Sequence, residues 1–401
     1  MDLFKKIYLI VSVLLCCIAC SSVEGIENNG TIEGITFANY PRVDGSTSTK
    51  PLNAMIACKL LNIRYEWVSN IVGEWSLQAN EEDIPTGYSD FFGERIKVSQ
   101  THGAFMNLID GNTDIILTHR TISPDEKAHA DEIGVSLMEN SIAIDAFVFI
   151  VNKNNPLRSL TVEQVQRIYT GNITNWNEVG GTDNEIKAFT RPRNSGSEEV
   201  MRELVMDGLE MADFPESSEI PSMAGTFTEV RNNINGLCYT FNFYKDVMVR
   251  MPDEIVPKIA INGIFPSEHT VKNGTYPFIS KVHVAIRSDL DHNSTACKLY
   301  EWLQTEAANA AIVESGYIPK SEATSGTAKI SADQLQVYPN PVMDCLYFYP
   351  AHSIIKAEIY NQAGRLVFSE SGVKEKMDVS ALSAGMYILR CDGVVSKFLK
   401  H

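Results

Sequence analysis

Short apolar runs alternate with stretches of helical periodicity between about Ile35 and Lys320. Short apolar runs predict buried strands, and we expect them at residues 115–117, 142–144, 147–151 and 282–286. Apolar residues spaced three and four apart predict helices at 161–170, 198–209 and 294–314. This alternation predicts an α/β architecture. Ligands of open α/β sheets bind beyond the carboxyl ends of the strands, so polar residues there are the first candidates for a site.

Two loops rich in hydroxyl groups each precede a predicted helix. The first contains Ser46, Thr47 and Ser48, and the second contains Ser195, Gly196 and Ser197 after two arginines, Arg191 and Arg193. Unpaired N–H groups and the helix dipole make such helix starts suitable for anions. The alternative is an ordinary capping box, Ser195 to Glu198, on a surface helix. Because the two loops lie in separate halves of the chain, we expect two lobes that direct helix N-termini at one shared anion.

A third polar loop, Thr118, His119 and Arg120, ends the predicted strand 115–117. A histidine or an arginine at such a place is equally compatible with an ordinary hydrogen-bonded or surface residue. Asp145 lies inside an apolar run, where a carboxylate needs a partner. It therefore either accepts a structural hydrogen bond or contacts the ligand or hinge, and we favour the structural role.

Composition excludes several classes of function. The 401 residues carry a formal net charge of −16, which argues against nucleic acid and anionic membrane surfaces as partners. The five cysteines beyond residue 20 show no C-x-x-C spacing, so no zinc or redox site is expected. No H-E-x-x-H, G-x-x-x-x-G-K-[ST] or supported Ser-His-Asp motif occurs. We therefore expect a binding protein without cofactor rather than an enzyme, with a secreted hydrolase as the least favoured alternative.

The N-terminus predicts export. Lys5 and Lys6 precede an apolar run that ends at Ala19, which is the pattern of a secretory signal peptide over residues 1–19. The following Cys20 resembles the lipidated cysteine of a bacterial lipobox, although Cys17 departs from the usual leucine. Lipidation at Cys20 and plain signal-peptidase cleavage near Ala19 both remain open.

The order of these motifs resembles the phosphate-type periplasmic solute-binding proteins of ABC transporters. The resemblance extends over roughly residues 36–320, and its most specific segment is Thr170-Gly-Asn-Ile-Thr-Asn-Trp176. It implies a two-lobed, hinge-closing, type II-like fold with phosphate buried between the lobes. The first lobe would comprise 36–142 and 287–320, the second 153–281, and the crossing strands would lie near 143–152 and 282–286.

The resemblance also implies a set of ligand contacts. The matching positions are Ser46, Thr47 and Ser48, then Thr118, His119 and Arg120, then Arg193, Ser195, Gly196 and Ser197. Two positions depart from the family pattern. His119 stands where a serine usually precedes the arginine, and Ser197 replaces a threonine, which keeps the hydroxyl. The first departure leaves another oxyanion or a phosphorylated small molecule as an alternative ligand.

An acceptor carboxylate would add selectivity to such a site. Protonated phosphate can donate a hydrogen bond, whereas sulfate cannot near neutral pH. We expect Asp44 in this role, with Asp145 and then Asp114 as the other candidates.

The amino-acid composition of the chain changes after Pro319. Residues 321–334 have the small, polar composition of a linker, and 335–401 alternate short strands with turns, which predicts a small all-β sandwich. This segment resembles the type A C-terminal sorting domain of the type IX secretion system of Bacteroidetes, through Tyr338-Pro-Asn-Pro341 and Ala384-Gly-Met-Tyr387. The alternative is an accessory β module that binds a ligand of its own.

The two ends of the chain imply different locations. A sorting domain implies the secretion machinery as a partner and a position at the cell surface or outside the cell. A lipobox implies a periplasmic lipoprotein. We favour the first location, in which an ABC permease is a less direct partner and surface scavenging or storage of phosphate becomes a hypothesis.

Overall fold

A computed structural model describes residues 30–70, 73–323, 336–338, 342–349, 354–361, 365–373, 376–391 and 394–400. The chain divides after Ala323 into two compact units. The predicted signal peptide, Cys20 and residues 324–334 of the predicted linker lie outside the described residues.

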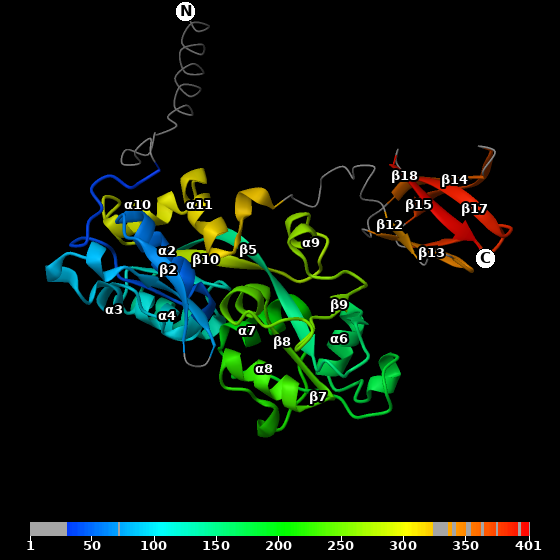
Figure 1. Ribbon diagram of the computed structural model, residues 1–401, viewed down its shortest axis with the longest axis horizontal. Coiled ribbons are helices and arrows are strands. Elements are labelled where there is room, and N and C mark those ends of the chain that lie inside the picture. Colours follow the sequence, from blue (N-terminus) through cyan, green and yellow to red (C-terminus); the bar gives the residue numbers. More distant parts are fainter. Residues whose placement is uncertain are drawn as a thin grey trace, which may run out of the picture. The chain divides into compact units, whose positions relative to one another are not determined.

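The larger unit is built on one seven-stranded mixed sheet (Figure 1). Its main path runs in the order β1 (Val43–Gly45), β4 (Ile115–Thr118), β10 (Ile279–Arg287), β5 (Leu137–Val151), β8 (Gly236–Phe241) and β7 (Lys187–Ala188), with β11 (Ile318–Pro319) paired to β5. In the described part of this unit, two shorter strand pairs lie outside this path, β2 (Tyr65–Ser69) with β3 (Trp75–Ala79) and β6 (Ser159–Leu160) with β9 (Ala260–Ile261).

Strand β5 joins two lobes, as Figure 1 shows. Its residues 137–146 pair with β10, and its residues 147–151 pair with β8. We call lobe one the part that contains β1, β4, β10 and the first segment of β5, and lobe two the part that contains β7, β8 and the second segment. The chain returns to lobe one at Phe278–Ile279, where the Phe147 N–H donates to the Phe278 carbonyl at 2.8 Å.

Helices cover the sheet in both lobes. Lobe one carries α2 (Lys50–Leu60), α3 (Phe91–Arg95), α4 (Gln100–Ile109), α5 (Pro124–Ile133), α10 (Thr295–Trp302) and α11 (Glu306–Ser315). Lobe two carries α6 (Val162–Tyr169), α7 (Gly196–Val200), α8 (Met223–Asn232), α9 (Glu268–Lys272) and two π-helices, η5 (Met201–Met206) and η7 (Tyr244–Met248). Short 3₁₀ segments are η1 (Thr47–Thr49), η2 (Glu81–Asp83), η3 (Thr86–Tyr88), η4 (Trp176–Val179), η6 (Glu216–Ser218) and η8 (Lys320–Glu322).

Three predicted elements differ from the observed ones. The runs 142–144 and 147–151 belong to one strand of 15 residues, because the polar Asp145 between them does not interrupt the ladder. The predicted helix 294–314 is two helices, and Thr305 begins the second as its N-cap. The predicted helix 198–209 begins at Gly196 and continues from α7 into the π-helix η5.

The smaller unit consists of two antiparallel sheets. One sheet has the order β12 (Gln336–Tyr338), β13 (Cys345–Tyr349), β16 (Lys376–Asp378), and the other has the order β15 (Leu366–Val373), β14 (Ile354–Asn361), β17 (Gly385–Cys391), β18 (Val394–Lys400). Leu346 and Met377 of the first sheet share a core with Ile359 and Leu389 of the second. The predicted α/β fold with two lobes and a small all-β sandwich is therefore confirmed.

Candidate functional site

A small cavity of about 130 Å³ lies between the two lobes. Lobe one contributes Ser46, Thr47, Ser48, Glu74, Gln100 and Thr101 to its wall. Lobe two contributes Arg191, Ser195, Gly196, Ser197, Ser222 and Tyr244, together with apolar atoms of neighbouring residues. The hydroxyl groups of the two predicted loops therefore meet in one place.

Helix starts surround this cavity. Ser46 is the N-cap of η1, Ser99 that of α4, Ser195 that of α7 and Ser222 that of α8. First-turn N–H groups and helix dipoles from both lobes therefore favour a negative charge in the cavity. The sequence patterns indicated the first and third of these starts. They missed α4 and α8, because each is preceded by a single serine rather than by a run of hydroxyl residues.

The first loop is fixed to the end of β4. The Ser46 N–H donates to the Leu117 carbonyl at 3.1 Å, and Thr49 Oγ1 donates to the same oxygen at 2.8 Å. A Cβ atom on Gly45 would lie 2.5 Å from that carbonyl oxygen, so the close approach of β1 to β4 requires glycine here. The loop is thus held rigidly with its hydroxyl groups toward the cavity.

Arg191 is the positive charge of the cavity. Its side chain is buried, with 6% of the residue exposed, and its Nε and Nη1 atoms have no hydrogen-bond partner among the described residues. Ser197 Oγ, on the same wall, is likewise without a partner within the described part of the chain. Burial lowers the pKa of Arg191 from its ordinary value, yet a guanidinium remains protonated in proteins. The buried Glu198 carboxylate acts on Arg191 through its charge, but the Nε and Nη1 donors that lack a partner among the described residues still favour a bound anion.

The predicted contact Arg193 lies elsewhere. It is exposed, in the turn that precedes α7, and it is outside the cavity lining described above. The next residue, Asn194, has a left-handed conformation with φ of 69° and turns the chain toward α7. Of the two arginines in this loop, the structure therefore directs Arg191, not Arg193, into the cavity.

The third predicted loop supports lobe one instead of lining the cavity. Thr118 Oγ1 donates to the Arg120 carbonyl at 2.8 Å. The Arg120 guanidinium forms two bonds of 2.7 Å to the buried Glu126 carboxylate. His119 Nε2 lies 2.8 Å from the Tyr317 hydroxyl, and the His119 ring packs on Phe241 with 4.0 Å between centroids.

His119 is a neutral residue in this environment. Burial lowers its pKa to about 3, and the nearby His283 adds to the effect. The imidazole therefore supplies no positive charge to the cavity near neutral pH. Its position between Phe241 of lobe two and Tyr317 of lobe one makes it part of the packing between the lobes.

Asp44 accepts three hydrogen bonds. They come from the N–H groups of Gly45 at 2.7 Å and Ser99 at 2.8 Å and from Asn107 Nδ2 at 2.8 Å. The carboxylate thus ties β1 to the start of α4, next to the cavity, and lies outside its lining. Asp44 orients two of the loops that form the cavity.

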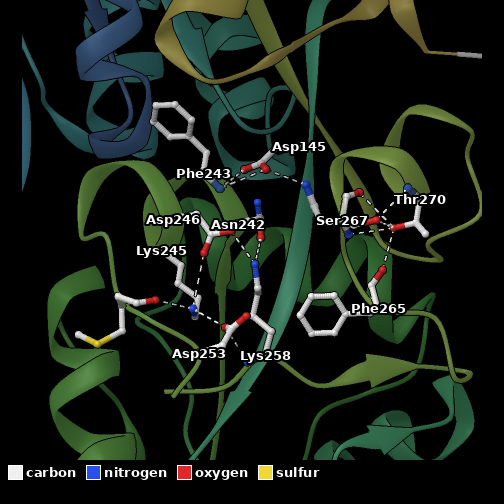
Figure 2. A network of polar contacts seen from close by, with 12 residues as sticks. Asp145, Asn242, Phe243, Lys245, Asp246, Asp253, Lys258, Phe265, Ser267 and Thr270 are labelled. Atoms are coloured by element: carbon white, nitrogen blue, oxygen red, sulfur yellow. Dashed lines mark hydrogen bonds and ion pairs between the residues drawn. The ribbon is translucent and has the colours of Figure 1, made fainter. Parts of the chain in front are cut away.

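Asp145 lies where β5 passes from one lobe to the other. Its carboxylate accepts from the N–H groups of Ala146 at 2.8 Å and Phe243 at 3.1 Å, as Figure 2 shows for Phe243. Phe243 in turn stacks on Tyr317 of lobe one with 3.8 Å between ring centroids. Burial raises the pKa of Asp145 to about 7, against the lowering effect of these N–H groups. Its position at the crossing is that of a hinge residue.

Asp145 should make the stability of the protein depend on pH. Because its pKa is raised on folding, the folded state binds the proton more tightly, and stability falls as pH rises between about 4 and 7. Asp145→Asn keeps an acceptor oxygen and removes this effect. We expect the variant to exceed the wild type by on the order of 3 kcal/mol at pH 8, with little difference at pH 4. Urea unfolding across this range measures the difference, and Asp213→Asn at an exposed position is the control for the substitution itself. A pH-independent difference for Asp145→Asn would contradict the assignment.

Glu74 is a cavity carboxylate that the sequence patterns missed. It lies in the turn between β2 and β3, and it accepts a hydrogen bond from the hydroxyl of Tyr244 in lobe two. Among the cavity-lining residues within the described chain, it is the sole carboxylate. No motif marked it, because a single glutamate in a hairpin turn is a common surface feature.

The described residues offer neither a metal site nor a membrane span. No group of three or more His, Cys, Asp or Glu side chains in this part of the chain is arranged to hold a metal ion. Within the same residues, no helix combines the length and apolar character needed to cross a bilayer.

Two α/β lobes that share a crossing strand and line one cavity have the architecture of the two-lobed binding proteins. The chain belongs to the PBP superfamily, since a model of the PBP superfamily domain matches residues 66–306. A model of the secretion system C-terminal sorting domain matches residues 336–400.

Among curated proteins, the chain is similar to the phosphate-binding protein PstS of Bacillus subtilis, with 24% identity over 213 residues. That match covers 53% of this chain and 64% of the relative, so just under two thirds of the B. subtilis protein is spanned. The PstS protein of Staphylococcus saprophyticus is 25% identical over 58% of this chain and 73% of its own length. The solved structure of an ABC-type phosphate transport receptor from Vibrio cholerae is 24% identical over 70% of this chain and 99% of its own, with a TM-score of 0.49.

Proposed function

We propose that this chain is an extracytoplasmic solute-binding protein that captures inorganic phosphate in the cavity between its lobes. The observation that carries the proposal is that Arg191 Nε and Nη1 and Ser197 Oγ are buried without a hydrogen-bond partner among the described residues, at a point where helices from both lobes begin. The curated relatives named above are phosphate-binding proteins, which supports the choice of anion.

The proposed contacts combine one full charge with many dipolar donors. Arg191 provides a charge-assisted hydrogen bond, and the remaining donors are the hydroxyl and N–H groups of Ser46, Thr47, Ser48, Thr101, Ser195, Gly196, Ser197 and Ser222. Such donors replace the hydration shell of a tetrahedral anion while burying little net charge. Four further residues hold the loops in position without contacting the ligand: Thr118, His119, Arg120 and Asp44.

Glu74 takes the acceptor role that the sequence assigned to Asp44. All three hydrogen bonds to Asp44 come from structural donors, whereas Glu74 lines the cavity. A carboxylate there accepts a hydrogen bond from protonated phosphate and repels sulfate, which has no proton to donate near neutral pH.

The size of the cavity favours a free anion over a phosphorylated small molecule. At about 130 Å³ it is smaller than the range of roughly 300–1,000 Å³ that is usual for organic ligands. A free tetrahedral oxyanion fits such a volume, so another inorganic oxyanion remains the competing ligand.

The sequence motifs near both ends of the chain support an activity outside the cytoplasm. The match of a secretion sorting domain over residues 336–400 supports transport through the outer membrane, with the secretion machinery as a partner. We therefore favour a surface-attached or released protein over a periplasmic lipoprotein anchored at Cys20. An ABC permease of the inner membrane is then an indirect partner, and capture of scarce phosphate at the cell surface is the proposed role.

Calorimetric titration of the purified chain, stripped of co-purified anions, tests the proposal. We expect phosphate and arsenate, which share shape and protonation, to bind tightly, and sulfate to give no heat at the same concentrations. The Glu74→Gln variant should bind sulfate measurably and lose at least about tenfold in phosphate-over-sulfate preference. Failure of all three anions to bind would reject the function, and unchanged selectivity in Glu74→Gln would reject the role of Glu74.

A further inference from the structure

The β2–β3 hairpin is a rigid part of lobe one. Its strands pair from Tyr65 with Ala79 to Ser69 with Trp75, and Leu77 packs in one apolar cluster with Met55 of α2. The Tyr65 hydroxyl donates to Glu314 of α11 at 2.5 Å. The hairpin therefore moves with lobe one when the lobes move.

Two side chains of this hairpin contact lobe two. Glu74 accepts a hydrogen bond from Tyr244, and the Arg250 guanidinium carbon lies 3.6 Å from the centroid of the Trp75 ring. Glu74 and Tyr244 line the anion cavity, whereas Trp75 and Arg250 lie outside that lining. The second contact joins the lobes without touching the ligand.

Arg250 is held in an unfavourable backbone conformation. Its φ of 50° is left-handed, which costs energy for a residue with a side chain. The buried Lys245 fixes the neighbouring chain by donating to the Met251 carbonyl at 2.6 Å and to Asp253 Oδ1 at 2.7 Å (Figure 2). The strain is therefore imposed by the surrounding structure, and its result is a guanidinium presented to Trp75 across the lobe boundary.

We propose that Trp75 and Arg250 form an interlobe clamp that slows release of the bound anion. Opening the lobes separates the hairpin from the segment that follows η7, so this contact must break before the anion can leave. An exposed cation–π contact of this kind should slow release about two- to fivefold. The inference rests on the proposed binding of an anion between the lobes.

Release of radiolabelled phosphate from the purified chain, chased with unlabelled phosphate, tests the clamp. Trp75→Leu and Arg250→Gly should each raise the release rate about two- to fivefold. Because both variants remove the same contact, the double variant should release phosphate no faster than the faster single variant. Glycine adopts a positive φ without penalty, so the Arg250→Gly variant should keep the thermal stability of the wild type. Faster release by this variant would then be due to the lost contact and not to misfolding.

The matched control is Lys187→Ala. It removes a cation–π contact with Phe189 that lies within lobe two, and it should leave the release rate unchanged. Wild-type release rates in both single variants, or effects that multiply in the double variant, would overturn the clamp while leaving the binding function intact. Absence of phosphate binding by the wild type would overturn both.

Discussion

Replacing Arg191 by methionine should abolish capture of phosphate while making the empty protein more stable. Loss of a buried, charge-assisted contact should weaken phosphate binding at least about 100-fold. In the empty protein, Arg191 Nε and Nη1 are buried and lack partners within the described residues, so their removal should raise the free energy of unfolding by about 1–3 kcal/mol. Calorimetric titration and urea unfolding of the same variant measure the two opposite effects.

Arg193→Met is the matched control for Arg191→Met. Arg193 belongs to the same loop and carries the same charge, but it is exposed. We expect its removal to change affinity less than about threefold, as for a screened surface charge. Equal losses in the two variants would show that the whole charge of the loop, rather than one directed guanidinium, attracts the anion.

The Arg120→Met variant should have a lower free energy of unfolding than the wild type, while its ligand contacts stay unchanged. The Arg120 side chain is 2% exposed and its partner Glu126 is fully buried, so the variant leaves a carboxylate without its bidentate partner. Breaking a buried pair in this way should lower the free energy of unfolding by about 3–5 kcal/mol. Urea unfolding measures the loss, and phosphate affinity should remain near that of the wild type wherever the variant is folded.

The double variant Arg120→Met/Glu126→Met distinguishes pairing from ligand binding. Removing both charges removes the buried carboxylate that has lost Arg120, so part of the lost stability should return. The return is incomplete because Glu126 also pairs with His102 at 2.9 Å and accepts the α5 capping bond from the Ser123 N–H at 2.9 Å. Retained stability together with lost phosphate affinity in the single variant would instead assign Arg120 to the binding site, as the family resemblance implied.

The fold could be predicted because its signals are local. Apolar runs and helical periodicity marked β4, β5, β10 and α6, and they predicted the α/β class. The two-lobed fold was what the family resemblance implied. The continuity of β5 could not be predicted in the same way. In a sequence, a carboxylate between two apolar runs indicates a break in the strand. Asp145 remains in the strand because it accepts hydrogen bonds from the N–H groups of Ala146 and Phe243, and the Phe243 donor is in place only in the folded hinge.

The site was predicted in part for the same reason. Hydroxyl loops before helices are visible in a sequence, so Ser46–Ser48 and Ser195–Ser197 were found, and the structure brings them together. The sequence does not show which way an arginine side chain points in the folded protein. Arg191 and Arg193 differ by the turn at Asn194, and Arg120 differs from Arg191 in having Glu126 within reach. Glu74 reaches the cavity only because the hairpin packs on α2, far from it in sequence.

The volume of the cavity also limits how many anions one chain can hold. Under the proposed function, a space of about 130 Å³ holds a single tetrahedral anion, so each chain of 401 residues would carry one phosphate at a time. This stoichiometry is unsuited to storage, because every stored phosphate ion would require its own protein molecule. Repeated loading and emptying therefore suits the proposed role better than storage does, and the contacts between the lobes then bear on how quickly each anion is released.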